Sequence, residues 1–415
     1  MKKKILAYIL LMLPAVLMTS CLKDQDDTFS ESATLRSANY LANVKEVLMS
    51  SENGWILNYY PDREQSYGGF VYTLKFDKQN VTVGFELAKD ISKTITTTYM
   101  LDNEDGPVIS FDTYNDYLHF FSTPTSSSGA GGYEAYDGDF IFIIMNVSED
   151  KNTITLKGNR TGNIMYMHRL TGSDGEDYLD DILELKKAMP INYMIPDGAD
   201  MITASLSNGV ATFEGEDTDI EVAFHYTNNG IEFYEPITIQ NHEITGITYA
   251  GSAETYPAMG DETLLLYPII LPLNVMFANS TSFVAISNVS EAAQEYFYAC
   301  KDVSDDENEL IAYMFFYDNA LNFVSGTYKG TIGLNYNVIG EDKVKFEYDK
   351  TSTNRNGNWY YDAGYKDLID YLESTTFTIS ADSEVNPSYY ILTDDNDETK
   401  YFKLELSVVY NPFEK

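Results

Sequence analysis

Apolar and polar residues alternate with a period of two over many short stretches, and this pattern constrains the fold more than any other feature of the chain. Every second residue from Phe70 to Phe76 is apolar, so these side chains share one face of a predicted strand. After a polar turn, residues 81–87 alternate in the same way. The two stretches therefore predict a β-hairpin with one buried face.

Short strands of this kind recur over residues 55–170, separated by polar turns with almost no helix between them. This regular spacing favours an antiparallel barrel or sandwich over strands that alternate with helices. The other strands predicted in this part are 55–60, 94–101, 108–111, 118–121, 140–147, 153–157 and 164–170.

The second half of the chain is also rich in predicted strands. Asn228-Asn229-Gly230 joins two of them and is a strong hairpin signal. Two prolines interrupt the apolar run 264–273, which we therefore expect at the edge of a sheet. The other strands predicted here are 210–213, 220–226, 231–234, 237–239, 244–249, 344–348 and 402–408.

Four stretches predict helices. Residues 30–50 begin with Ser30 as a capping residue, and 174–189 carry acidic residues at the start and lysines near the end. Two shorter helices are predicted over 290–300 and 362–373. We therefore expect a mainly β fold with few helices. Its parts are an antiparallel barrel- or sandwich-like N-terminal domain over 30–172, a connecting helix over 173–190, and a second β-rich region over 191–415 with a possible sub-boundary near 325.

Cys21 ends a pattern that is typical of a lipoprotein export signal. Three lysines at 2–4 precede an apolar run over 5–18, and two small residues stand directly before Cys21. We expect residues 1–20 to be removed, Cys21 to carry a lipid that tethers the protein to a membrane, and 21–29 to form an acidic tether. An uncleaved membrane anchor is the alternative, although 14 apolar residues are too few to span a bilayer comfortably.

The chain has only two cysteines, so if Cys21 is acylated, Cys300 has no partner for an intramolecular disulfide. The apolar surroundings of Cys300 predict a buried, inert thiol, and a catalytic thiol is the alternative. The formal charge is −37, and loss of residues 1–20, with three lysines and no acids, makes it about −40. Such acidity argues against nucleic acid as a partner and against electrostatic binding to an anionic membrane.

The sequence contains no GxSxG motif, no phosphate-binding glycine loop and no dinucleotide fingerprint. Acidic clusters at 302–309 and 394–398 lack the spacing of a calcium loop, so we expect solvated turns, with adventitious calcium as the alternative. We expect no catalytic residue, no metal site and no cofactor; whether the protein is an enzyme stays open, with a non-enzyme favoured. The four histidines form no close pair and are expected in strands or loops: His119, His168, His225 and His242.

The run Asn-Gly-Asn-Trp-Tyr-Tyr at 356–361 places an exposed turn beside three aromatic residues. Trp359, Tyr360 and Tyr361 are therefore candidates for stacking on a sugar ring or another flat ligand. Packing of these rings in a hairpin core is the alternative.

Several short segments carry a resemblance to a known family. They are Cys21 with its acidic follower, Phe29-Ser30-Glu31-Ser32-Ala33 with Arg36, Asn53-Gly54-Trp55, Tyr59-Tyr60-Pro61, Gly68-Gly69-Phe70, 109–115, Leu118-His119, Gly138-Asp139-Phe140 and 156–160. Together they resemble a family of Bacteroidetes-type lipoproteins catalogued as domain of unknown function 4302. The resemblance implies a surface-exposed lipoprotein, usually encoded among nutrient-uptake systems built from a TonB-dependent transporter and a cell-surface binding lipoprotein. It brings no catalytic residues.

The acidic tract after Cys21 resembles the export signal that sends such lipoproteins to the outer face of the outer membrane; its residues are Lys23, Asp24, Asp26 and Asp27. We therefore expect a lipid-anchored surface protein that serves as a non-enzymatic accessory or binding component of a nutrient-uptake system, with the transporter and the surface lipoprotein as partners. A hydrolase acting on glycan or peptide is one alternative, and a structural or adhesive surface protein is another. Two facing carboxylates in a cleft would favour the hydrolase, and an incomplete sheet would favour the adhesive protein.

Overall fold

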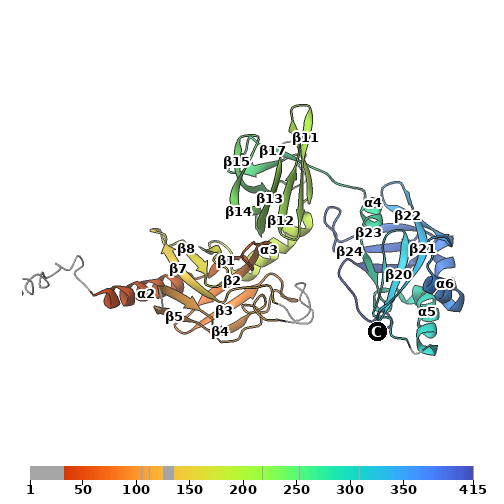
Figure 1. Cartoon of the computed structure of the whole chain (residues 1–415), viewed down its shortest axis with the longest axis horizontal. Helices are drawn as coiled ribbons and strands as arrows, with labels where there is room; N and C mark the ends of the chain where they lie inside the picture. Colours follow the sequence, from red (N-terminus) through yellow and green to blue (C-terminus); the bar gives the residue numbers. More distant parts are fainter. Residues whose placement is uncertain are drawn as a thin grey trace, which may run out of the picture.

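The computed structural model describes residues 32–103, 106–111, 113–124, 135–216, 218–251, 253–307 and 309–414. The predicted signal, Cys21, the tract Lys23 to Asp27 and Ser30 lie outside these residues. Figure 1 shows three β units in chain order: an open sheet, a first barrel and a second barrel. The predicted mainly β, antiparallel, barrel-like fold is confirmed. In the described part of the chain, no helix has the length and apolar character needed to cross a membrane.

The first unit is a nine-stranded antiparallel sheet with the order β4-β3-β2-β1-β9-β8-β7-β6-β5. Its buried face consists of aromatic and aliphatic side chains at alternate positions along the strands, as the period of two predicts. The strands are β1 (Trp55–Tyr59), β2 (Phe70–Phe76), β3 (Asn80–Phe85), β4 (Ile95–Thr98), β5 (Met100–Asn103), β6 (Pro107–Ser110), β7 (Ile141–Val147), β8 (Thr153–Gly158) and β9 (Ile164–Arg169).

Helix α2 (Ala33–Met49) precedes the sheet. Ser32 caps it, because its side-chain oxygen accepts a hydrogen bond from the backbone N–H of Leu35 at 3.3 Å. The far end of the helix is tied to β1, since the indole Nε1 of the fully buried Trp55 donates to the carbonyl of Leu48 at 2.9 Å. The helix therefore covers part of the sheet core.

One predicted strand of this unit is wrong. Residues 118–121, which include His119, form turns instead. The side-chain oxygen of Asn115 accepts hydrogen bonds from the backbone N–H groups of Tyr117 and Leu118, and so starts a helical turn. Leu118 and Phe121 are buried at helical spacing, which explains why the segment is apolar without being a strand.

The first barrel contains eight strands in sequence order and is closed by pairing of its first and last strands. Tyr193 pairs with Pro268 and Met194 with Tyr267. The predicted edge segment is therefore wrong: Pro268 is the last residue of its strand, where a missing N–H removes a bond only at the strand end. The strands are β10 (Asn192–Asp197), β11 (Asp200–Ser207), β12 (Val210–Glu214), β13 (Asp219–Thr227), β14 (Gly230–Ile239), β15 (His242–Thr248), β16 (Tyr256–Met259) and β17 (Leu265–Pro268).

The second barrel is also closed, by pairing of its first strand with its last. Its strands are β18 (Ser282–Val284), β19 (Tyr313–Phe316), β20 (Ala320–Ser325), β21 (Tyr328–Ile339), β22 (Lys343–Asp349), β23 (Thr376–Ala381), β24 (Tyr389–Asp394) and β25 (Asp397–Glu405). The two barrels divide between Pro268 and Ser282, not near 325, because residue 325 ends β20 and its neighbours form a hairpin turn.

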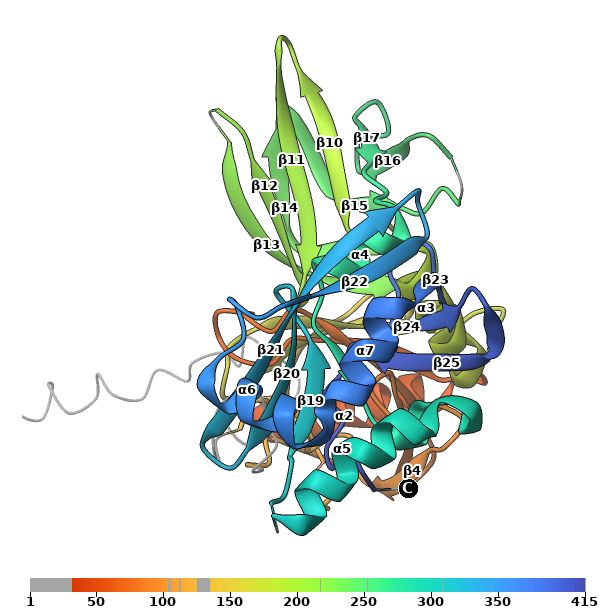
Figure 2. The same ribbon diagram turned by 90° about the vertical axis from the view of Figure 1, so that its right-hand side faces the viewer.

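In Figure 2, helices α5 (Gln294–Asp306), α6 (Arg355–Tyr360) and α7 (Lys366–Ser374) lie in front of the second barrel. Helix α4 (Leu273–Ala278) packs against β21 and β23. The remaining helical segments of this unit are η2 (Ile286–Asn288), η3 (Glu291–Ala293) and η4 (Tyr361–Tyr365). Cys300 lies on α5 and is fully buried in this core. Burial raises the pKa of its thiol, as expected for an inert cysteine.

Helix α3 (Gly175–Ala188) connects the sheet to the first barrel. Asp174 caps it by accepting from the backbone N–H groups of Glu176 and Asp177. The second barrel reaches the other end of this helix: the side-chain amide of Asn386 donates to the carbonyl of Lys186 at 2.8 Å, and the hydroxyl of Ser383 donates to that of Lys187. All three units therefore meet at α3.

Candidate ligand-binding site

The sheet and the first barrel meet through two glycines. A Cβ atom added to Gly209 would lie 2.7 Å from the Cα of Gly68, and both residues have positive φ angles, +77° and +72°. Beside them, the backbone N–H of Gly69 donates to the carbonyl of Phe224 on β13 at 2.8 Å. Only residues without a side chain allow so close an approach of two backbones. This contact fixes the position of the barrel on the sheet.

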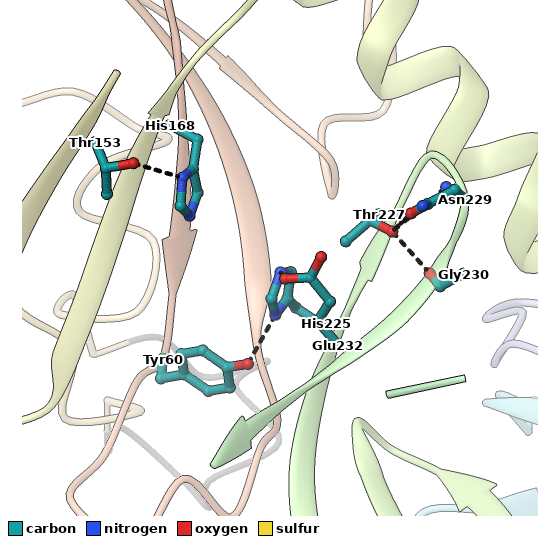
Figure 3. Close-up of polar contacts among 8 residues, drawn as sticks. All are labelled: Tyr60, Thr153, His168, His225, Thr227, Asn229, Gly230 and Glu232. Carbon is teal, nitrogen blue, oxygen red and sulfur yellow. Dashed lines mark hydrogen bonds and ion pairs between the residues drawn. The ribbon is translucent and has the colours of Figure 1, made fainter. Parts of the chain in front are cut away.

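Tyr60 and His225 form a second contact across the same junction (Figure 3). The hydroxyl of Tyr60 lies 2.8 Å from Nδ1 of His225, and both residues are buried. Burial lowers the pKa of His225 to about 3 and raises that of Tyr60 well above its ordinary value, so both are neutral at neutral pH. The Tyr60 hydroxyl and Nδ1 of His225 therefore share a hydrogen bond between neutral groups, and the tautomer of the ring decides which of them donates.

The Nε2 atom of His225 points toward Glu232, whose Oε2 lies 3.8 Å away, too far for a hydrogen bond. Tyr60, His225 and Glu232 thus follow the order of a catalytic relay, but an imidazole with such a low pKa is a weak base at neutral pH. The Tyr60 hydroxyl is also shielded from solvent. We interpret this cluster as a buried polar contact that holds the first barrel against the sheet.

A cavity of about 610 Å³ opens beside the contact of Tyr60 with His225, between the sheet, α3 and the first barrel. The contact of Gly69 with Phe224 forms part of its wall. Its volume falls within the range of small-molecule sites, about 300–1,000 Å³. Seven aromatic residues line it: Tyr67, Phe70, Phe120, Phe121, Tyr136, Phe224 and Tyr226.

Glu86 and Lys186 bring opposite charges into this aromatic cavity. The Nζ of Lys186 lies 3.2 Å from Oε1 of Glu86, whose side chain is only 1% exposed. Burial raises the pKa of Glu86, although Lys186 opposes the shift. Lys186 also lies over the ring of Tyr226, with Nζ 4.9 Å from the ring centroid. The second carboxylate oxygen of Glu86, Oε2, is buried and has no hydrogen-bond partner in the described part of the chain.

A buried carboxylate oxygen without a hydrogen-bond partner lowers the stability of the folded protein by roughly 1–3 kcal/mol. The loss is larger when the group is charged. A bound water or a donor that arrives with a ligand could supply the missing hydrogen bond. The arrangement can hold a molecule with an apolar body against the rings and a hydrogen-bond donor against Glu86. The wall also includes Ser66, whose hydroxyl donates to Oδ2 of Asp62.

The other histidines lie elsewhere. Nδ1 of His168 lies 3.3 Å from the hydroxyl of Thr153 (Figure 3). His168 also lines a polar cavity of about 310 Å³ on the other side of the junction. His242 pairs with Asp261 at 2.7 Å on the first barrel. Among the residues that the structure describes, no group of three or more His, Cys, Asp or Glu side chains is placed to hold a metal ion.

The predicted stacking residues do not form one surface. The segment 356–361 is not an exposed turn but lies in α6 and the start of η4, because the side chain of Asn354 accepts from the backbone N–H of Gly357 and caps a helix. Trp359 is 45% exposed, whereas Tyr360 is buried. Tyr361 instead stacks on Tyr348, with ring centroids 4.6 Å apart. Successive residues of a helix point in different directions, which separates the three rings.

Comparison with known families matches residues 25–251 to the family described as Domain of unknown function (DUF4302). The chain belongs to this family. The matched range contains the sheet, α3 and every residue that lines the aromatic cavity, including Glu86, Lys186 and Gly209. The cavity is therefore built entirely from the part of the DUF4302 chain that defines the family.

A search of curated proteins found no match. Solved structures similar to the chain include the β subunit of DNA polymerase from Streptococcus pyogenes, at 10% identity with 91% of this chain and 98% of that one covered, and a TM-score of 0.14. Another is the β chain of DNA polymerase III from Streptococcus pneumoniae, at 12% identity, 90% and 98% coverage, and a TM-score of 0.12. TM-scores this low carry no argument about fold or function.

Sequence reasoning missed Glu86 and Lys186. Glu86 falls on the polar face of the predicted hairpin, where an acid is expected to face solvent. In the structure, α3 and the first barrel cover that face. The segment Gly68-Gly69, in contrast, is one of those that carry the family resemblance, and its place at the junction supplies a physical reason for two adjacent glycines.

Proposed function

We propose that this protein is a lipid-anchored protein of the outer membrane surface that binds a small organic ligand as a non-enzymatic component of a nutrient-uptake system. The cavity between the sheet and the first barrel is the proposed binding site. The observation that carries the proposal is the unpartnered Oε2 of Glu86 in a wall of aromatic rings. Membership of the DUF4302 family and the export pattern at Cys21 support the cellular setting.

The cavity lining specifies the chemistry of the ligand. Seven aromatic rings favour an apolar or aromatic body, because rings gain from both burial and stacking. Lys186 already balances the charge of Glu86, so the ligand needs a hydrogen-bond donor and not necessarily a full positive charge. An amine, amide or hydroxyl group attached to a flat or apolar skeleton satisfies both conditions.

The proposal is tested by recovering the native ligand. The full lipoprotein is purified from membranes in mild detergent, and small molecules released on denaturation are identified by mass spectrometry. Leu87 lines the cavity and is 42% exposed, so Leu87→Trp blocks the cavity without opening the core. Leu265→Trp is the matched control, because Leu265 is 38% exposed on β17, away from the cavity.

We expect the same compound from the wild type and from Leu265→Trp, and at least about tenfold less from Leu87→Trp. Equal recovery from both variants would place the ligand elsewhere. The same preparation shows whether a TonB-dependent transporter copurifies. Recovery of neither ligand nor transporter, together with turnover of a glycan or peptide, would contradict the proposal and favour a hydrolase.

The anchor has a separate test. We expect Cys21→Ala to move the protein from the membrane fraction to the soluble fraction, because the acyl chains are its proposed attachment. Cys300→Ala is the control and should leave the protein on the membrane, since Cys300 is buried on α5 in the core of the second barrel unit. If Cys21→Ala remains in the membrane fraction, the proposed lipid anchor is wrong.

A further inference from the structure

A second cavity, of about 250 Å³, lies in the second barrel between the β20–β21 hairpin, the end of α5 and α6. It lies outside the residues that match the DUF4302 family and shares no residue with the first cavity. Two of the three rings singled out in the sequence, Trp359 and Tyr360, line it. This second cavity is therefore separate from the first one and lies on a different unit of the protein.

The cavity has exposed aromatic walls and a buried aromatic floor. Tyr328 is 71% exposed and Trp359 is 45% exposed, although both rings would gain from burial. Below them, the ring of Phe323 packs edge-to-face on Tyr360, with centroids 4.6 Å apart. A Cβ atom on Gly330 would lie 2.0 Å from the Phe323 ring, so the glycine lets this ring lie flat against the backbone.

Polar groups surround these rings and are mainly acceptors. Glu307 and Glu309 are among the residues that line the cavity. The side-chain amide of Asn356 donates to the carbonyl of Lys329 at 3.1 Å, which leaves its own oxygen to accept. The hydroxyl of Tyr360 is buried and has no hydrogen-bond partner within the described residues. A ligand here must bring hydroxyl or N–H donors together with a flat apolar face.

We infer that this cavity binds a neutral saccharide. A pyranose ring has a C–H face that stacks on an indole or phenol ring, and its hydroxyls donate to carboxylate and amide oxygens. The two carboxylates, on a chain of formal charge −37, disfavour an acidic sugar. The inference goes beyond the proposed function, because this site is independent of the aromatic cavity beside Glu86.

The chain offers a direct optical test, because it has only two tryptophans. Trp55 is fully buried and Trp359 is half exposed, so quenching by acrylamide reports on Trp359. The full lipoprotein in detergent is titrated with maltohexaose, cellohexaose and mannohexaose, and binding of each is also measured by calorimetry. We expect at least one of them to protect Trp359 from quenching.

Variants locate the site. Trp359→Ala and Tyr328→Ala should each weaken saccharide binding by at least about tenfold, because each removes a stacking face. Both side chains are exposed, so the midpoint of thermal unfolding should change little. Tyr317→Ala is the matched control, as Tyr317 is 47% exposed in the β19–β20 turn of the same barrel.

Leu87→Trp in the first cavity should leave saccharide binding unchanged, which separates this inference from the proposed function. Saccharide binding that survives Trp359→Ala would overturn the inference. Protection of Trp359 by tyramine but by none of the three oligosaccharides would also overturn it, in favour of a cationic ligand held by the two glutamates. Absence of binding by all three sugars in calorimetry would overturn it equally.

Discussion

Replacement of Gly209 by alanine is expected to lower the free energy of unfolding of the sheet and first barrel by about 3 kcal/mol. Two costs add together. A residue with a side chain held at a φ of +77° loses roughly 1–2 kcal/mol. The new Cβ would also lie 2.7 Å from the Cα of Gly68 and 2.9 Å from the carbonyl oxygen of Tyr67, and such overpacking costs roughly 1–3 kcal/mol. Urea denaturation followed by circular dichroism measures the change.

Gly198→Ala separates these two costs. Gly198 lies in the β10–β11 turn of the same barrel with a φ of +61°, but nothing lies within 4 Å of a Cβ atom built on it. This control should lose only the backbone contribution, about 1 kcal/mol. If both variants lose the same free energy, the close approach of Gly68 and Gly209 does not hold the two units together.

Removal of the Lys186 charge is the second large effect. Lys186→Met keeps most of the side-chain volume but leaves Glu86 as an uncompensated charge whose side chain is 1% exposed. Removal of one partner of a buried ion pair lowers the free energy of unfolding by about 3–5 kcal/mol. Lys187→Met is the matched control, because Lys187 is the exposed neighbour on the same helix. It should change the free energy of unfolding by less than about 0.5 kcal/mol.

The loss in Lys186→Met should depend on pH. Burial raises the pKa of Glu86 in the folded protein, so its contribution to stability is complete below the unfolded pKa and is lost as pH rises through the folded pKa. Lys186 opposes this shift, and its removal raises the folded pKa further. The deficit of the variant should therefore be smallest near about pH 4.5 and largest near about pH 7.5, as measured by urea denaturation at both. A deficit that is equal at the two pH values would show that Glu86 is not the group responsible.

The sequence predicts the strands of this protein well, because alternation is a local pattern that depends on one buried face. It fails where pairing is decided by distant residues or by side-chain capping. Nothing local in Leu265–Pro268 indicates that this segment pairs with Tyr193, since the closure of a barrel depends on all of its strands. At 118–121, one amide side chain, that of Asn115, converts an apolar run into a turn.

The site was harder to predict than the fold. From the sequence alone, an acidic residue on the polar face of a hairpin is expected to be solvated, and only the packing of another unit buries it. The sequence around Glu86 therefore does not indicate a binding site. The sequence at 356–361 is aromatic, but its helix separates Tyr361 from Trp359. Tyr328, from a distant hairpin, stands in its place at the second cavity. A sequence pattern cannot show which distant segments share a cavity.

Lys186 also has a consequence for how the units influence one another. Its ammonium group faces the first cavity, while its carbonyl accepts a hydrogen bond from Asn386 of the second barrel. A ligand that moved the backbone of Lys186 would change this hydrogen bond, and docking of the second barrel would then change affinity for the ligand by the same factor. Lys186 is thus the single residue of α3 through which the first cavity and the second barrel are in contact with the same element.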